Sequence, residues 1–130
     1  MSTLRRTGVL MIASALTLGT TTTVAQASSA RTGNQAVARP MVAAHGWSRA
    51  QFDCLSRLWT RESNWNHRAR NRYSGAYGIP QALPAGKMAG AGRDWRTNPR
   101  TQIRWGLGYI KQRYGSPCRA WAHFGSRGWY

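Results

Sequence analysis

Apolar residues in the middle of the chain recur at helical spacing and predict a helix that begins near residue 48. Four of them share one face: Phe52, Leu55, Leu58 and Trp59. Ser48, with Gln51 three residues later, is the arrangement of a capping box, which marks a helix start. Glu62 falls within the same apolar stripe near the C-terminal end of this helix, where a hydrophobic residue is expected.

The next segment, from 64 to 79, has no clear periodicity. It is rich in turn-forming residues: Asn64, Asn66, Asn71, Ser74, Gly75 and Gly78. We therefore expect an irregular segment or a short hairpin after the first helix. A short helix is expected after Pro84.

A second long helix is predicted to begin at Asn98, an N-cap residue followed by proline at the first helical position. Its apolar face carries Ile103, Leu107, Ile110 and Tyr114. Gly106 lies on this face and permits close approach of another element. The helix should end at Gly115, and a last short helix is expected over 119–124.

The first thirty residues have the layout of a secretory signal peptide. Arg5 and Arg6 form a positive region, residues 8–19 are apolar, and residues 25–27 (Ala-Gln-Ala) form a small-x-small cleavage pattern. The apolar stretch is too short to span a bilayer, which needs about 20 residues. We expect residues 1–30 to be removed on export, and we expect no stable membrane insertion.

Residues 31–46 contain no aromatic residue, whereas every Trp, Tyr and Phe lies at or after Trp47. We therefore expect a flexible leader over 31–46 and one folded domain over 47–130. Cys54 and Cys118 are the only cysteines, and an exported chain this small commonly uses a disulfide. The alternative is a pair of free, buried thiols.

The charge is strongly positive, with 19 Lys and Arg against 3 Asp and Glu, a formal net charge of +16. Such a chain is expected to meet a polyanion or an anionic surface. Nucleic acid is the usual candidate, but export argues against it. The peptide carboxylates and anionic polymers of a bacterial wall are the expected partners. The alternative is that arginine only keeps a small exported protein soluble.

Glu62 is the only glutamate in the chain. Burial on the apolar face raises a carboxyl pKa, and the negative end of the helix dipole acts in the same direction. A carboxyl that stays protonated near neutral pH is suited to protonate a glycosidic oxygen. The alternative is a structural ion pair with an arginine such as Arg61 or Arg68.

Glycoside hydrolysis ordinarily uses two carboxylates. Asp53 lies about 13.5 Å from Glu62 along the helix axis and on the opposite face. Asp94 lies in a loop beside Trp95, where a structural role as a cap or arginine partner is expected. One carboxylate suffices when the sugar's own hydroxyl attacks the anomeric carbon, as in a lytic transglycosylase. A hydrolase that uses Asp94 remains the alternative.

The pair Glu62-Ser63, followed by Ser-Gly-Ala-Tyr-Gly-Ile-Pro-Gln over 74–81, resembles the lytic transglycosylase (SLT) domain of the lysozyme-like superfamily. In that family a Glu-Ser pair precedes a Gly-Leu-Met-Gln segment that lines the cleft. The helix after Asn98 is similar to the family's next helix through Gln102-Ile103, Gly106 and Tyr109-Ile110. The resemblance covers about residues 47–125.

The resemblance implies a mainly α, lysozyme-like fold and cleavage of the MurNAc–GlcNAc bond of peptidoglycan. It implies that Glu62 is both acid and base, with Ser63 and Gln81 beside the sugar. Two departures stand out: Ile79-Pro80 replaces Leu-Met, and Ala-Trp-Ala around Trp121 replaces the family's Ala-Tyr-Asn. Trp121 is the candidate for the place of that tyrosine. In its small size the domain also resembles resuscitation-promoting factors of the same superfamily. Hydrolysis with water as the acceptor therefore remains an alternative reaction.

Three aromatic residues near the Glu-Ser and Gly-x-x-Gln segments are candidates for sugar contacts: Trp65, Tyr73 and Tyr77. The three histidines lack metal-ligand spacing, so we expect no metal and no cofactor. We expect a secreted, wall-associated monomer. A non-catalytic cationic wall-binding or antimicrobial protein is the remaining alternative.

Overall fold

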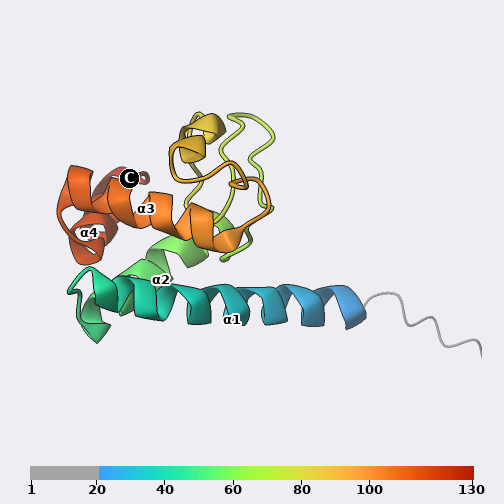
Figure 1. Cartoon of the computed structure of the whole chain (residues 1–130), viewed down its shortest axis with the longest axis horizontal. Helices are drawn as coiled ribbons and strands as arrows, with labels where there is room; N and C mark the ends of the chain where they lie inside the picture. Colours follow the sequence, from blue (N-terminus) through green and yellow to red (C-terminus); the bar gives the residue numbers. More distant parts are fainter. Residues whose placement is uncertain (1–20) are drawn as a thin grey trace, which may run out of the picture.

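The computed structural model describes residues 21–130, and the mainly α fold predicted from the sequence is confirmed for this part (Figure 1). The elements in chain order are α1 (Thr21–Ala44), α2 (Arg49–Ser63), the 3-10 helix η1 (Ala85–Gly90), α3 (Pro99–Tyr114) and α4 (Pro117–Arg127). Residues 1–20 of the expected signal peptide lie outside the described residues. Nothing in residues 21–130 forms a helix long and apolar enough to cross a membrane.

The expected flexible leader is instead part of helix α1, so that prediction is wrong over 31–44. Ala38 and Val42 are buried in the core, and the Asn34 side chain donates to the Trp65 carbonyl at 2.8 Å. These three residues recur every four positions and so share one helix face. The expectation relied on aromatic residues and overlooked a face made of small ones, so the folded region begins before Trp47.

Helix α2 lies at the centre of the fold and packs against α1 and α4. Its predicted apolar face is confirmed, with Phe52, Leu55, Leu58 and Trp59 buried. Ser48 is the N-cap, but its side chain makes no capping hydrogen bond.

The predicted capping box is therefore absent, because Gln51 has another partner. Its side-chain oxygen accepts from the backbone N–H of Cys118 at 2.8 Å. The Cys54–Cys118 disulfide joins the same two helices across 64 residues of sequence. α2 and α4 are thus linked covalently and by a hydrogen bond at their N-terminal ends.

Helix α3 starts as predicted. The Asn98 side chain accepts from the backbone N–H of Arg100 at 3.0 Å, and Pro99 is the first helical residue. Ile103, Leu107 and Ile110 are fully buried, and the helix ends at Gly115 with a φ of 86°. α4 is longer than the predicted 119–124 at both ends.

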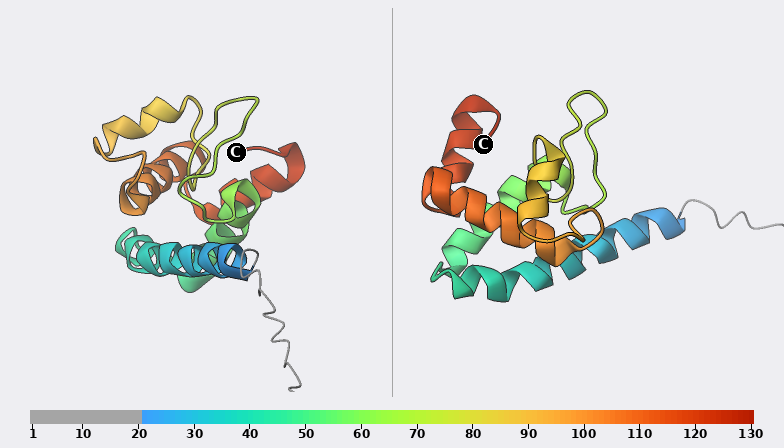
Figure 2. Two further views of the ribbon diagram at one scale, coloured as in Figure 1. Left: turned by 90° about the vertical axis from the view of Figure 1, so that its right-hand side faces the viewer. Right: turned by 45° about the horizontal axis from the view of Figure 1, so that its top comes forward.

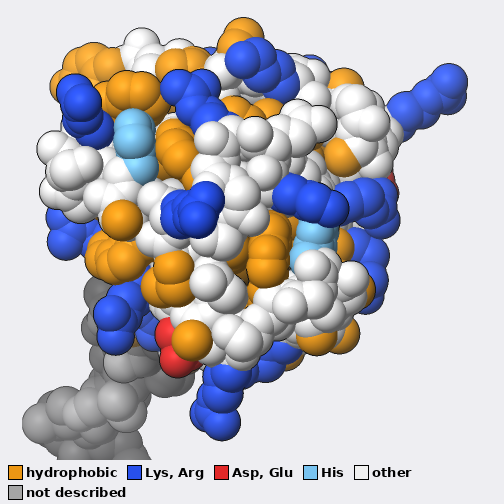
Figure 3. All heavy atoms as spheres, turned by 90° about the vertical axis from the view of Figure 1, so that its left-hand side faces the viewer, with side chains coloured by type: hydrophobic (Ala, Val, Ile, Leu, Met, Phe, Trp, Pro, Cys, Tyr) orange, Lys and Arg blue, Asp and Glu red, His pale blue; other side chains and the backbone are white. Residues whose placement is uncertain are grey.

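The chain between α2 and α3, residues 64–98, forms loops and η1 on one side of the helices (Figure 2). The irregular segment is confirmed, and the possible hairpin is reduced to two isolated bridges, Arg70–Tyr77 and Tyr77–Ala82. η1 follows Pro84 as expected. Figure 3 shows Lys and Arg side chains spread over one face of the molecule, with few acidic side chains among them.

Gly106 allows α3 to pack closely against the Trp59 side chain of α2 and against Pro80, as the sequence suggested. A Cβ atom at this position would lie 2.6 Å from Cζ2 of the buried Trp59 and 3.1 Å from Cβ of Pro80. We predict that Gly106→Ala destabilises the fold by about 1–2 kcal/mol, because overpacking outweighs the gain in helix propensity. Thermal or urea unfolding measures this change.

Gly108→Ala is the matched control. Gly108 belongs to the same helix as Gly106, but a Cβ atom at this position would have no neighbour within 4 Å. It should leave stability unchanged or raise it by up to about 1 kcal/mol. Equal effects of the two substitutions would refute the close packing of Gly106 against Trp59.

Candidate active site

Glu62 lies in the last turns of α2 and is half-buried. Burial raises the pKa of its carboxyl from 4.5 to about 7, and no neighbouring cation counters that shift. The alternative of an ion pair with Arg61 or Arg68 therefore has no support in the described residues. A substantial fraction of Glu62 is protonated at neutral pH, which is the state a general acid requires.

Tyr130 connects Glu62 to the rest of the site. Its hydroxyl accepts from the Trp59 indole N–H at 2.8 Å and donates to the Pro80 carbonyl at 2.8 Å. Burial and then the negative charge of Glu62 raise the pKa of Tyr130 well above its usual range. The two hydrogen bonds place the hydroxyl between Trp59 of α2 and Pro80, within electrostatic range of the Glu62 carboxyl.

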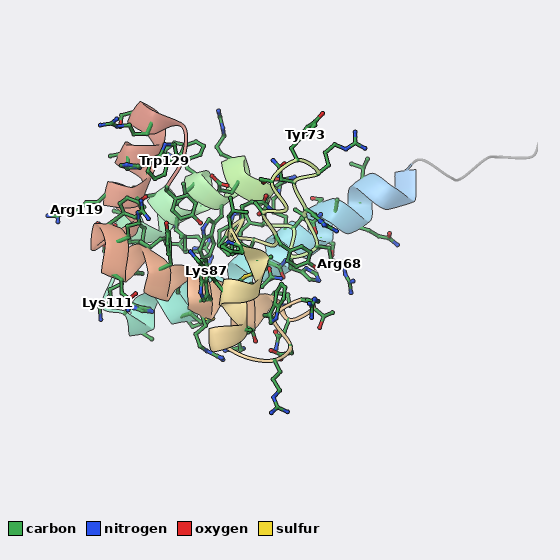
Figure 4. The ribbon with its side chains drawn as sticks, turned by 90° about the horizontal axis from the view of Figure 1, so that it is seen from above. Arg68, Tyr73, Lys87, Lys111, Arg119 and Trp129 are labelled. Atoms are coloured by element: carbon green, nitrogen blue, oxygen red, sulfur yellow. A yellow bond between two sulfur atoms is a disulfide. The ribbon has the colours of Figure 1, made fainter. Side chains whose placement is uncertain are left out.

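A cavity of about 360 Å³, here called the aromatic cleft, opens beside Tyr130. It is lined by Leu83, Lys87, Trp105, Tyr109, Arg113, Trp129 and Tyr130. The rings of Trp105 and Tyr109 stack at 5.2 Å, and Tyr109 meets Tyr130 edge-on at 5.9 Å. Figure 4 labels two of these residues, Lys87 on η1 and Trp129 near the end of α4. Glu62 does not line the cleft itself, but Tyr130, which does, is hydrogen-bonded to Trp59 of the helix that carries Glu62.

The chemistry of the cleft suits a carbohydrate. Aromatic rings present flat apolar surfaces on which the C–H faces of sugars pack, and Tyr and Trp add a polar edge. Lys87 and Arg113 bring positive charge to the same cavity. A second cavity of about 320 Å³ shares Trp105 and Tyr109 with the cleft, so the aromatic surface continues along α3.

Ser63 and Gln81 position the loop beside Glu62. The Ser63 hydroxyl donates to the Ile79 carbonyl at 2.7 Å. The Gln81 amide donates to the carbonyls of Ala69 at 3.1 Å and Gly78 at 3.0 Å. These bonds hold the Gly-x-x-Gln segment against the end of α2, while direct contact of either residue with a sugar stays a prediction.

Gln102 is the buried residue that fixes these loops. Its side-chain oxygen accepts from the Ile79 N–H at 2.9 Å, and its amide nitrogen donates to the carbonyls of His67 at 2.9 Å and Trp95 at 2.8 Å. A Cβ atom at Gly78 would overlap this amide, and Gly78 also has a φ of 78°. The sequence drew attention to Gln102 only through its similarity to the family's helix.

Trp65 is a core residue, so its assignment to the cleft is wrong. The side chain is fully buried, lies edge-on to Trp59 at 5.2 Å, and donates to the Ser56 carbonyl. The apolar surface of α2 and the helix α1 cover it, and the expectation did not include α1 in the fold. Its nearness to Glu62 in sequence was therefore misleading.

The other three predicted aromatic contacts occupy different places. Tyr73 is 92% exposed and projects from the outer tip of its loop (Figure 4). Tyr77 is half-buried, and its hydroxyl donates to the Arg96 carbonyl at 2.7 Å. Trp121 stacks on Phe124. It lines a cavity with Ser56, Arg57, Thr60 and Arg61.

The residues of α2 in that cavity point away from the helix face that carries Glu62. Trp121 is therefore not the aromatic neighbour of Glu62, which corrects its assignment to the tyrosine's place. Tyr130 is the aromatic residue whose pKa the Glu62 charge raises, and sequence reasoning missed it. Tyr130 lies 68 positions after Glu62 and belongs to no helical pattern, so no spacing pointed to it.

Neither aspartate pairs with Glu62. Asp53 is exposed on another face of α2. The two carboxylate oxygens of Asp94 accept from Thr101 at 2.6 Å and Asn98 at 2.7 Å, and these bonds lower its pKa. Asp94 is thus the loop cap that the sequence suggested. Across residues 21–130, no three His, Cys, Asp or Glu side chains gather as a metal site would require.

We predict that Gln102→Met lowers the free energy of unfolding by about 3 kcal/mol or more, because it leaves buried backbone groups without hydrogen-bond partners. Urea unfolding measures this loss. Gln112→Met, at an exposed position of the same helix, is the control and should change stability by less than about 0.5 kcal/mol. A Gln102→Met variant as stable as the control would contradict the role given to this amide.

Comparisons of the chain with models of protein families, with curated proteins and with solved structures found no match.

Proposed function

We propose that the protein is a lytic transglycosylase that cleaves the MurNAc–GlcNAc bond of peptidoglycan. The observation that carries the proposal is the state of Glu62. The only glutamate in the chain is half-buried and has a pKa of about 7. Its negative charge raises the pKa of Tyr130, a residue that lines the aromatic cleft and is hydrogen-bonded to Trp59 of the same helix. The resemblance of Glu62-Ser63 and residues 74–81 to the lytic transglycosylase domain supports the same reaction.

The mechanism follows from one carboxyl that changes protonation state. Protonated Glu62 donates its proton to the glycosidic oxygen as the bond to the anomeric carbon breaks. The resulting carboxylate then removes the proton from the C6 hydroxyl of the muramyl sugar, whose oxygen attacks the anomeric carbon. The product is a 1,6-anhydromuramyl end, no water is consumed, and Glu62 returns to its protonated form.

Water as the acceptor is less well supported. Hydrolysis with inversion or retention would use a second carboxylate at about 5–9.5 Å from the first. Asp94, the candidate from the sequence, directs both oxygens to the N-terminus of α3. A hydrolase would have to break these hydrogen bonds of Asp94 or work without a second carboxylate beside Glu62.

The charge of the chain fits a substrate in the wall. With a net charge of +16 and only 3 acidic residues, the protein is expected to be attracted to the carboxylates and anionic polymers of a bacterial wall. Secretion is part of the proposal, and the Cys54–Cys118 disulfide favours an oxidising compartment. The same charge also suits a non-catalytic cationic protein, which would not need the acid at position 62.

Mass spectrometry of fragments released from purified peptidoglycan tests the proposal. We predict muropeptides that are lighter by one water than their reducing-end counterparts, and no such products from Glu62→Gln. The rate should fall about tenfold between about pH 6 and about pH 8, because the protonated fraction of a carboxyl with a pKa of about 7 falls by that factor.

Asp53→Asn is the matched control, since it removes an exposed carboxylate from the same helix, and it should retain activity. Reducing-end products lost in Glu62→Gln would establish a hydrolase instead. Wall binding or bacterial killing that is equal in Glu62→Gln and fades with salt, with no released fragments, would identify a non-catalytic cationic protein.

A further inference from the structure

The structure has a separate cavity of about 370 Å³, here called the arginine pocket. It is lined by Arg70, Gly75, Tyr77, Ala85, Trp95 and Arg96. It shares no lining residue with the aromatic cleft. Neighbouring residues of one segment line the two cavities: Leu83 and Lys87 line the cleft, and Ala85 lines the pocket.

The aromatic part of the arginine pocket is fixed in place. Tyr77 and Trp95 meet edge-on at 5.8 Å, and the Tyr77 hydroxyl donates to the Arg96 carbonyl at 2.7 Å. The Tyr77 backbone pairs with Ala82, and the Trp95 carbonyl accepts from Gln102 at 2.8 Å. A ligand therefore meets rings that are already ordered, which reduces the entropy lost on binding.

The two guanidinium groups give the pocket its chemistry. Arg96 stacks over the Trp95 ring at 4.4 Å, an arrangement that leaves the N–H groups at its edge available to an acceptor. Asp94, the acidic residue next to Trp95, accepts instead from Thr101 and Asn98. Positive charge in the pocket is thus not offset by the nearest carboxylate in the sequence.

We infer that the arginine pocket binds a carboxylate of a short peptide. The planar guanidinium fork pairs with a planar carboxylate through two parallel hydrogen bonds. The volume lies within the range of small-molecule sites, of about 300–1,000 Å³, and suits the end of a branch. A phosphodiester polymer would rather follow an open row of cations along its length.

The identity of the polymer to which this peptide belongs rests on the proposed function. If the glycan strand occupies the aromatic cleft, a peptide branch that passes η1, whose Lys87 and Ala85 line the two cavities, would enter the arginine pocket. The pocket would then select strands that still carry peptides with free carboxylates. Amidated or peptide-free strands would lose this contact.

Isothermal titration calorimetry at low salt tests the inference on full-length Glu62→Gln, which binds without turnover. The probes are a synthetic tetrapeptide with free side-chain and C-terminal carboxylates, the same tetrapeptide with both groups amidated, and poly(glycerol phosphate). Arg70→Gln/Arg96→Gln removes both guanidinium groups. Arg119→Gln/Arg127→Gln is the control, because it removes the same charge from exposed positions of α4.

The pocket variant should bind the free-carboxylate peptide on the order of 10- to 100-fold more weakly than Glu62→Gln alone, as expected for lost charge-assisted hydrogen bonds. The control should change affinity by less than about twofold, and amidation should weaken binding as much as the pocket substitutions do. Arg70→Lys/Arg96→Lys, which keeps the charge and removes the fork, should give an intermediate affinity.

Equal affinities in the pocket and control variants, or equal affinities for the free and amidated peptides, would overturn the inference. Loss of poly(glycerol phosphate) binding in the pocket variant, with peptide binding unchanged, would assign the pocket to phosphodiesters and also overturn it. These results do not depend on turnover. The fragment assay tests the proposed reaction and calorimetry tests peptide binding, so either one can fail without the other.

Discussion

The loops that form the site depend on one buried side-chain amide. Between α2 and α3 the chain runs from residue 64 to 98 without a strand, so its backbone has few regular partners. Gln102 supplies hydrogen bonds to backbone groups of His67, Ile79 and Trp95, three points far apart in that segment. Leaving such groups unpaired in the interior is costly. Both the segment beside Glu62 and the floor of the arginine pocket are therefore held by the same residue.

Glu62 shows a conflict between stability and chemistry. Nearly every charged side chain in this protein is positive, which on its own would favour an ionised carboxylate. Burial nevertheless raises the pKa of Glu62 to about 7. A half-buried carboxyl in an apolar stripe does not improve packing, and sites that break local folding rules are often functional. The proposed reaction gives a reason for its presence.

Local patterns predicted much of the fold. The apolar faces of α2 and α3, the Asn98 cap, and Gly106 against Trp59 all follow from spacing along one helix. The errors arose where distant segments meet. Asn34, Ala38 and Val42 pack through small side chains that an aromatic-based domain boundary overlooked. Tyr130 meets Trp59 of helix α2 only through the tertiary fold. Trp65 is buried by elements that no nearby pattern indicates.

NMR tests most directly whether Glu62 stays partly protonated near neutral pH, on which the proposed role of this residue depends. Because Glu62 is the only glutamate, labelling with ¹³Cδ-glutamate should give a single carboxyl signal, which Glu62→Gln removes. We expect the chemical shift of this signal to titrate with a midpoint at about 7. A midpoint near 4.5, the ordinary value for a solvated glutamate, would contradict burial of the carboxyl and its role as a general acid.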